Sequence, residues 1–250
     1  MESYIIFINN KEDYSFNDIG TELFKIGSVL SYAYKSKKIL ALINDDYCNI
    51  IDIFLKIPYK KILVSEYNNY NFKTISNLDF YEHNNVCINK IEYVHKNISP
   101  EVRNLFTTAI INNSSHHYNT YRINDIMNHF TDYDINNYVC ITINKQSFIR
   151  NYYEKAYYSH FNGKKLVVFS NDLNWAIQNL NFIDSKLIYF IYTHNYDRFS
   201  NFALLVFFNN HIIEKNNTSW WGAFLGNYGK KVVVPNNSYE YYLDTWIKQS

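Results

Sequence analysis

The sequence predicts an α/β fold in which helices cover both faces of parallel sheets. Short runs rich in β-branched residues alternate with longer stretches in which apolar residues recur every three or four positions. The predicted strands are apolar on both faces, which is typical of parallel sheets buried between helices. Hydrophobic residues make up 47% of the 250 residues, which is enough for a sizeable core and excludes a disordered chain.

The C-terminal half shows this alternation most clearly. Its short apolar runs predict strands at 139–143, 165–169, 187–192, 211–213 and 231–235. Helical spacing follows each of the first four runs, at 148–161, 172–180, 198–210 and 218–226. A final helix that begins with a Ser cap is expected at 238–249. Strands and helices in this succession are typical of a Rossmann-like domain.

The N-terminal half begins in the same way. A buried strand at 4–8 is followed by a helix whose apolar residues step by four and three from Ile19 to Ala33. Further strands are expected at 38–43 and 61–65, and further helices at 50–56 and 99–111. The polar segment that follows holds the expected domain boundary, near Asp134. We therefore expect two Rossmann-like domains, 1–134 and 135–250.

Charge and cysteine content exclude several classes of protein. Lys and Arg number 24 against 23 Asp and Glu, with no charge block, so a nucleic-acid binder or a polybasic membrane-surface protein is not expected. The three cysteines are widely spaced and lack the spacing of a zinc site, which favours free thiols and a reducing compartment. The pair His116-His117 lacks a third ligand at a usable spacing, so no metal site is expected.

The sequence favours a cytoplasmic protein. No apolar run approaches the roughly 18–20 residues that span a bilayer, and the opening residues predict a strand rather than a signal peptide. The 37 Asn and 31 Ile against 6 Gly and 3 Pro are typical of an AT-rich genome. A parasite, an AT-rich bacterium or a large DNA virus fits that composition, with the host cytoplasm as the compartment of a viral protein.

Two segments place polar residues near the ends of predicted strands. Gly20 lies in the first turn of the helix after strand 4–8, where unpaired N–H groups attract an anion; alternatively, it only lets helix and strand pack closely. Ser170, Asn171 and Asp172 follow the strand 165–169, at the sheet edge where such folds bind ligands. Alternatively, Ser170 or Asn171 is an ordinary N-cap of the next helix, and Asp172 is a favourable residue of its first turn.

A third segment surrounds the start of the helix at 218–226. Small polar residues cluster there, namely Asn216, Asn217, Thr218 and Ser219. A phosphate at this helix start would meet side-chain hydroxyls and backbone amides together. The neighbouring Trp220 and Trp221 point to different faces of the helix; alternatively, both only fill gaps between domains.

In this order, the three segments resemble glycosyltransferase family 11, the alpha-1,2-fucosyltransferase-like enzymes. The family's GGLGNQ-type turn is similar to 19–24, and its FSDD-x-x-W segment to FSNDLNW at 169–175. Its late IIANSTFSWWGAxL segment resembles 212–225, and KVVVP at 231–235 resembles the strand that follows. The resemblance covers most of the chain, with residues 66–135 only loosely placed.

The resemblance implies a GT-B fold, in which two Rossmann-like domains face a central cleft. It implies inverting transfer of a hexose, fucose in the family, from GDP-fucose to a glycan acceptor, without metal or cofactor. The residues that it places at the donor are Asn144, Lys145, Ser170, Asp172, Asn217, Thr218 and Ser219. Gly20 would face the acceptor or the phosphates, and Glu22 is the candidate catalytic base, although it also suits a helix N-terminus.

One family segment differs strongly in this chain. The HxRRGDY segment, whose arginines face the donor phosphates, aligns with 142–148 and keeps only Lys145, a point charge in place of a planar fork. Arg150 is near enough to substitute after a local shift. The alternative function is therefore a degenerate relative that binds a glycan or nucleotide sugar without turnover; a changed donor is a third. An AT-rich genome disfavours arginine codons, so drift also accounts for Lys145.

Overall fold

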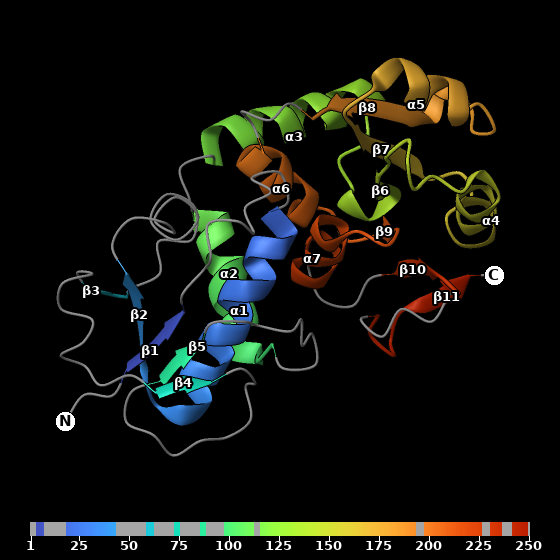
Figure 1. Cartoon of the computed structure of the whole chain (residues 1–250). Coiled ribbons are helices and arrows are strands. Elements are labelled where there is room, and N and C mark those ends of the chain that lie inside the picture. The colour runs from blue at the N-terminus through green and yellow to red at the C-terminus, as the bar shows by residue number, and fades with distance from the viewer. Residues whose placement is uncertain are drawn as a thin grey trace. The chain divides into compact units, whose positions relative to one another are not determined.

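The computed structural model describes part of the chain, in which two compact units are each built on a parallel sheet (Figure 1). The units comprise residues 1–113 and 114–250. The described residues are 4–7, 19–43, 59–62, 73–75, 86–88, 98–112, 116–193, 198–226, 231–236 and 242–249. The expected helix at 50–56 lies outside them.

The N-terminal unit orders its described strands β3-β2-β1-β5-β4, all parallel. These strands are β1 (Tyr4–Phe7), β2 (Ile39–Ile43), β3 (Lys60–Ile62), β4 (Lys73–Ile75) and β5 (Val86–Ile88). Helices α1 (Ile19–Ser36) and α2 (Pro100–Asn112) pack together, and the Ser99 N–H donates to Ser31 Oγ at 2.9 Å. The expected strands at 4–8 and 38–43 are thus confirmed, within the described residues, as β1 and β2, and the expected helices that begin near 19 and 99 as α1 and α2. Of the strand expected at 61–65, residues 61 and 62 are described, and they lie in β3.

The C-terminal unit orders its strands β11-β10-β9-β6-β7-β8, all parallel. These are β6 (Tyr138–Thr142), β7 (Lys165–Ser170), β8 (Ile188–Tyr192), β9 (His211–Ile212), β10 (Val232–Pro235) and β11 (Ile247–Gln249). Counted within this unit, the order is 3-2-1-4-5-6, the doubly wound order of dinucleotide-binding folds. The chain direction across the sheet reverses between the neighbours β6 and β9.

Successive residues of a strand point to opposite faces of the sheet, and apolar residues of β6 pack against helices on both faces. Val139 and Ile141 of β6 join a core that includes residues of α4 (Arg150–His160) and α5 (Leu173–Asn179). Tyr138 turns the other way, with its ring 6.1 Å from that of Phe208. Helices α3 (His116–Phe130), α6 (Arg198–Phe207) and α7 (Asn217–Leu225) contact one another in sequence, α6 touching both others (Figure 1).

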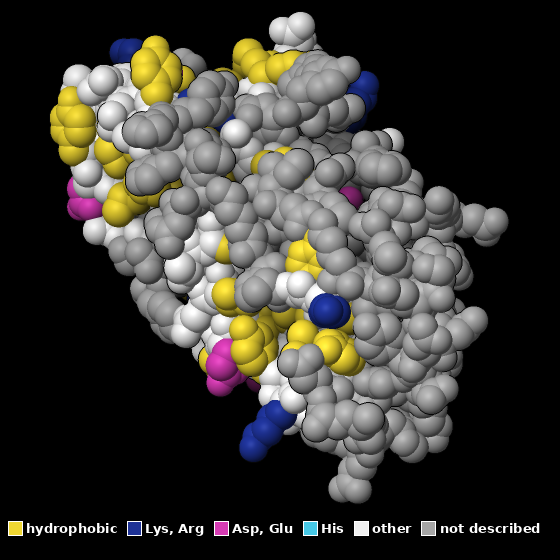
Figure 2. Space-filling model, turned by 90° about the vertical axis from the view of Figure 1, so that its left-hand side faces the viewer, with side chains coloured by type: hydrophobic (Ala, Val, Ile, Leu, Met, Phe, Trp, Pro, Cys, Tyr) yellow, Lys and Arg dark blue, Asp and Glu magenta, His cyan; other side chains and the backbone are white. Residues whose placement is uncertain are grey.

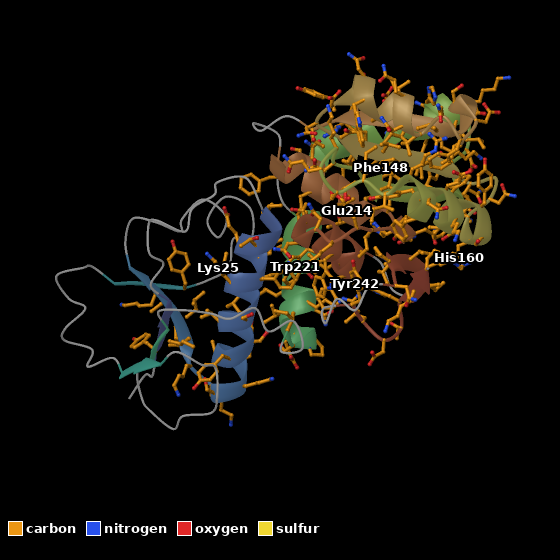
Figure 3. All side chains as sticks on the ribbon, turned by 45° about the vertical axis from the view of Figure 1, so that its right-hand side comes forward. Lys25, Phe148, His160, Glu214, Trp221 and Tyr242 are labelled. Carbon is orange, nitrogen blue, oxygen red and sulfur yellow. The ribbon has the colours of Figure 1, made fainter. Side chains whose placement is uncertain are left out.

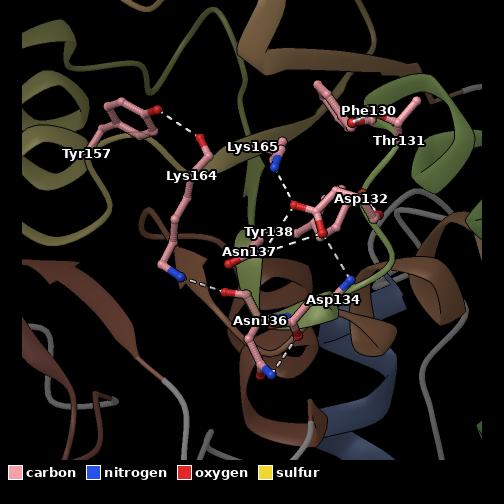
Figure 4. A network of polar contacts seen from close by, with 10 residues as sticks. All are labelled: Phe130, Thr131, Asp132, Asp134, Asn136, Asn137, Tyr138, Tyr157, Lys164 and Lys165. Atoms are coloured by element: carbon pink, nitrogen blue, oxygen red, sulfur yellow. Dashed lines mark hydrogen bonds and ion pairs between the residues drawn. The ribbon is translucent and has the colours of Figure 1, made fainter.

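The polar segment 112–137 contains helix α3, and the division between units falls before it, between 113 and 114. The sequence led us to expect a boundary near Asp134. Polar contacts explain the difference, because the turn after α3 is tied to the C-terminal sheet (Figure 4). Asp132 accepts hydrogen bonds from Lys165 Nζ and from Asn137 Nδ2, the latter at 3.1 Å. The Tyr138 hydroxyl donates to the Asp132 carbonyl.

The last described segment is not the helix that the sequence predicts at 238–249. Residues Ile247–Gln249 form strand β11, which pairs with β10 in the register Val233↔Ile247. Before it, the Trp246 N–H donates to the Leu243 carbonyl at 3.0 Å in a turn. The prediction is wrong here, because pairing with the edge of β10 gives this segment ladder hydrogen bonds that local helix propensity does not take into account. Among the described helices, none is both long and apolar enough to cross a membrane.

Candidate functional site

The reversal between β6 and β9 creates a ligand-binding edge in folds of this order. Strands β6 and β9 are hydrogen-bonded neighbours, in the register Ile141↔Ile212. The chain leaves β6 for α4 and leaves β9 for α7. We call residues 142–148 and 213–219, which follow the two strands, the switch-point edge. Phe148 and Glu214 mark it in Figure 3.

Helix α7 begins at this edge with a capped N-terminus. Asn216 is the N-cap, and its Oδ1 accepts a hydrogen bond from the Ser219 N–H at 3.0 Å. Asn217 and Thr218 occupy the first turn and are half-buried. Ser219 is fully buried, and its hydroxyl contacts that of Thr142 at the end of β6. The end of β6 is thereby fixed to the positive end of the α7 dipole, where an anion is stabilised.

The loop after β6 forms a tight turn that presents Lys145. The Asn144 carbonyl accepts from the N–H groups of Ser147 at 3.1 Å and Phe148 at 3.0 Å. Asn144 Oδ1 accepts from the Gln146 N–H at 3.0 Å, so this predicted donor-site side chain also shapes the turn. The Lys145 side chain is exposed at the tip.

A buried carboxyl group, which the sequence reasoning missed, lies between these two features. Glu214 is 4% exposed, and its Oε2 accepts a hydrogen bond from Ser147 Oγ at 2.7 Å. Tyr153 Oη lies 3.2 Å from the same Oε2 and 3.2 Å from the Thr142 carbonyl, so the two acceptors share its one proton. Burial raises the pKa of Glu214 above its usual range, while the two hydroxyls act in the opposite direction. A signal was present, since Glu214 directly follows the apolar run 211–213 and replaces the alanine of the IIANSTFSWWGAxL pattern.

Ser170 and Asp172 lie at the same edge, after the neighbouring strand β7. Phe169 is in register with Thr142 of β6. Ser170 is buried, and its Oγ accepts from the Asp172 N–H at 3.1 Å. Asp172 is an exposed N-cap of α5 that accepts from the Trp175 N–H at 3.0 Å. The N-cap is therefore Asp172 and not Ser170 or Asn171, and the Ser170 hydroxyl bonds only to the backbone of Asp172.

Arg150 is engaged away from the mouth of α7. Its Nη2 donates to Asn181 Oδ1 at 2.7 Å, and its guanidinium lies 5.2 Å from the centre of the Phe182 ring. Its Nε is 3.8 Å from Glu154 Oε2. On the face shown in Figure 2, Lys and Arg side chains of the described residues stand apart from one another. Lys145 and Lys215, both exposed, are the cationic side chains within the switch-point edge.

The remaining candidates belong to the N-terminal unit. Gly20 is buried in the first turn of α1, and Glu22 is the acidic residue of that turn, partly exposed. Within the described part of the chain, no three His, Cys, Asp or Glu residues are grouped so as to hold a metal ion. Cys140 is a buried free thiol in β6, and its burial raises its pKa well above the usual value.

Comparison with known sequences gives one partial relative. No family model matches the chain. The O-antigen biosynthesis glycosyltransferase WbnK of Escherichia coli is 31% identical over 109 residues, which cover 39% of this chain. The match spans 35% of WbnK, so the relative is matched over about a third of its length.

Comparison with solved structures extends over most of the chain. The fucosyltransferase NodZ from Bradyrhizobium superposes with a TM-score of 0.56 at 11% identity, covering 89% of this chain and 91% of NodZ. The NodZ alpha-1,6-fucosyltransferase soaked with GDP-fucose gives 0.57 at 12% identity, covering 90% and 93%. At such identities the likeness shows the fold alone. The expected fold class is confirmed: the chain has an α/β fold with parallel sheets, like the GT-B enzyme NodZ.

Proposed function

We propose that this chain is a glycosyltransferase that moves fucose from GDP-fucose to a hydroxyl group of a glycan. The observation that carries the proposal is the capped N-terminus of α7, which stands beside the Lys145 turn at the switch-point edge. A nucleoside diphosphate leaving group needs such a site, because its developing negative charge must be met by dipoles and cations. The partial sequence match to a glycosyltransferase and the fold of NodZ support the same reaction class.

Each donor-site residue receives a role from its position. Asn217 and Thr218 in the first turn of α7, together with Asn144 and Lys145 of the turn after β6, are proposed to bind the diphosphate. Ser219 holds α7 against β6 through Thr142. Ser170 and Asp172 are proposed to form the neighbouring wall of the donor site, because Ser170 is the last residue of the adjacent strand β7 and Asp172 caps the helix that follows.

The chemistry that we propose is a direct inverting displacement without metal. The acceptor hydroxyl oxygen forms a bond to the anomeric carbon as that carbon's bond to the phosphate oxygen breaks, and GDP leaves with the electron pair. Glu22 is proposed to accept the proton of the acceptor hydroxyl, with Gly20 beside it in the first turn of α1. These roles belong to the proposal.

Titration calorimetry with GDP-fucose, followed by a GDP-release assay over a panel of glycan acceptors, tests the function. We expect donor binding and acceptor-dependent release of GDP. No binding at millimolar GDP-fucose would refute the proposal. Binding without turnover on any acceptor would favour the degenerate relative, and tighter binding of another nucleotide sugar would change the donor.

A further inference from the structure

Glu214 is an unusual residue to bury at a site that we propose for an anion. Its carboxyl group is 4% exposed, and the two groups that donate hydrogen bonds to it, Ser147 Oγ and Tyr153 Oη, are neutral hydroxyls. Burying a carboxyl group without a cationic partner costs free energy, and hydrogen bonds offset only part of that cost. The cost points to a role for the side chain at this position.

The two hydroxyls come from the turn after β6 and from the helix that follows it. Ser147 closes the turn that begins at Asn144 and presents Lys145. Tyr153 lies in the first turn of α4, and its ring stacks on Phe148 at a centroid distance of 5.0 Å. A single carboxyl oxygen, Glu214 Oε2, therefore joins the turn to the helix that follows it.

The backbone of Glu214 makes the second half of the connection. Its carbonyl accepts a hydrogen bond from the Asn216 N–H at 2.8 Å, and Asn216 caps α7. One residue thus contacts the turn that carries Lys145 and also the cap of the helix whose N-terminus faces the same edge. Side chain and main chain act on two different parts of the proposed diphosphate site.

We infer that Glu214 is a positioning residue of the nucleotide-sugar site, whose carboxyl group fixes the turn carrying Lys145 beside the N-terminus of α7. The inference rests on the proposed function for its ligand. An exposed lysine on an unanchored turn loses conformational freedom when it binds a phosphate, so anchoring the turn in advance strengthens binding. The anchor also accounts for the exchange of a small alanine-type position for a buried acid.

Hydrogen exchange in the ligand-free protein tests the anchor. In Glu214→Ala, we expect exchange of the Gln146, Ser147 and Phe148 amides to rise about tenfold. In Glu214→Gln the side-chain carbonyl still accepts both hydrogen bonds, so exchange stays near the wild-type rate. Ser147→Ala removes only the partner on the turn and provides the same test if Glu214→Ala does not fold. Glu154→Ala, which removes a partly exposed acid of α4, is the matched control.

A double-mutant cycle on GDP-fucose affinity tests the link to Lys145. Lys145→Ala and Glu214→Ala should each weaken binding about tenfold, and the double variant should be little weaker than either. If the losses of affinity in the two single variants multiply in the double variant, the inference is overturned. Unchanged amide exchange in both Glu214→Ala and Ser147→Ala would overturn it as well, and either result leaves the proposed function standing. A wild-type protein that binds no nucleotide sugar would overturn both.

Discussion

Helices α5 and α7 both begin at the carboxyl edge of the C-terminal sheet and both have an Asx N-cap, yet they present different surfaces to a ligand. Asp172 caps α5 with an exposed carboxylate, whereas Asn216 caps α7 with a neutral amide. The nearby hydroxyl of Ser170 bonds back to its own turn, and that of Ser219 reaches across to Thr142 of β6. A carboxylate repels a diphosphate, whereas a neutral capped helix N-terminus stabilises one, so in the proposed donor site the diphosphate lies at α7.

The tryptophans of α5 and α7 differ in how deeply they are buried. Trp221 of α7 is fully buried and lies edge-to-face against Trp220, at a centroid distance of 5.3 Å. Trp175 of α5 is only partly buried and meets the Phe148 ring at 5.2 Å. The α7 segment is therefore built into the core of the unit, while the α5 segment packs on its side. Two motifs that each contain a tryptophan are thus expected to contribute differently to the stability of the fold.

The largest expected effect is on stability, and it separates the two tryptophans. Trp221→Ala should lower the free energy of unfolding by about 3–5 kcal/mol, because a large buried ring leaves a cavity. Trp175→Ala should cost less than half as much, since part of its ring is already in contact with water. Urea denaturation followed by circular dichroism measures both. Equal losses would remove the contrast between the segments.

A charge exchange between the two caps should have a smaller effect, and it concerns binding. Asn216→Asp keeps a good N-cap, so the melting temperature should not change. It adds a negative charge at the N-terminus of α7, so GDP-fucose affinity should fall about tenfold. Asp172→Asn removes a charge from the α5 cap and should not weaken the binding of GDP-fucose. Titration calorimetry on the two variants decides between the helices. Weaker binding in Asp172→Asn alone would move the diphosphate to α5.

Periodicity predicted the elements whose stabilising contacts are reflected in their own sequence. The helix α1 has apolar residues at steps of three and four, and β6, β7 and β10 are continuous apolar runs. The sequence shows only a polar segment where helix α3 forms, and Ile126 is the one buried apolar residue among the α3 residues whose side chains are described. Its contacts with α6 and the Arg122–Asn201 hydrogen bond of 2.9 Å come from distant sequence. Strand β11 depends likewise on pairing with β10.

The candidate site was predictable to a similar degree. The polar residues at the ends of β7 and β9 lie where parallel strands place ligands, and the motif order located them. The function of each side chain was not predictable, because Ser170 and Ser219 differ only in what stands beside them in space. The role of Glu214 could not be predicted, because it depends on the burial of the side chain, which the neighbouring residues in the sequence do not reveal.

The smallest expected effect is a pH dependence that distinguishes the buried carboxyl group of Glu214 from an exposed one. Burial raises the pKa of Glu214 in the folded protein. As the pH rises above about 4.3, the unfolded chain releases this proton first, so the free energy of unfolding falls until the pH passes the folded-state pKa. Glu214→Gln has no such proton, so its stability relative to wild type should rise over the same range.

Urea titrations of wild type, Glu214→Gln and Glu154→Gln between pH 4 and 8 measure this difference. Glu154→Gln makes the same substitution at a partly exposed side chain of α4 and serves as the reference for it. If the Glu214→Gln curve runs parallel to wild type, the carboxyl group ionises equally easily in both states. Its hydroxyl partners would then fully offset its burial, and the carboxyl group of Glu214 would carry no pH-dependent stability.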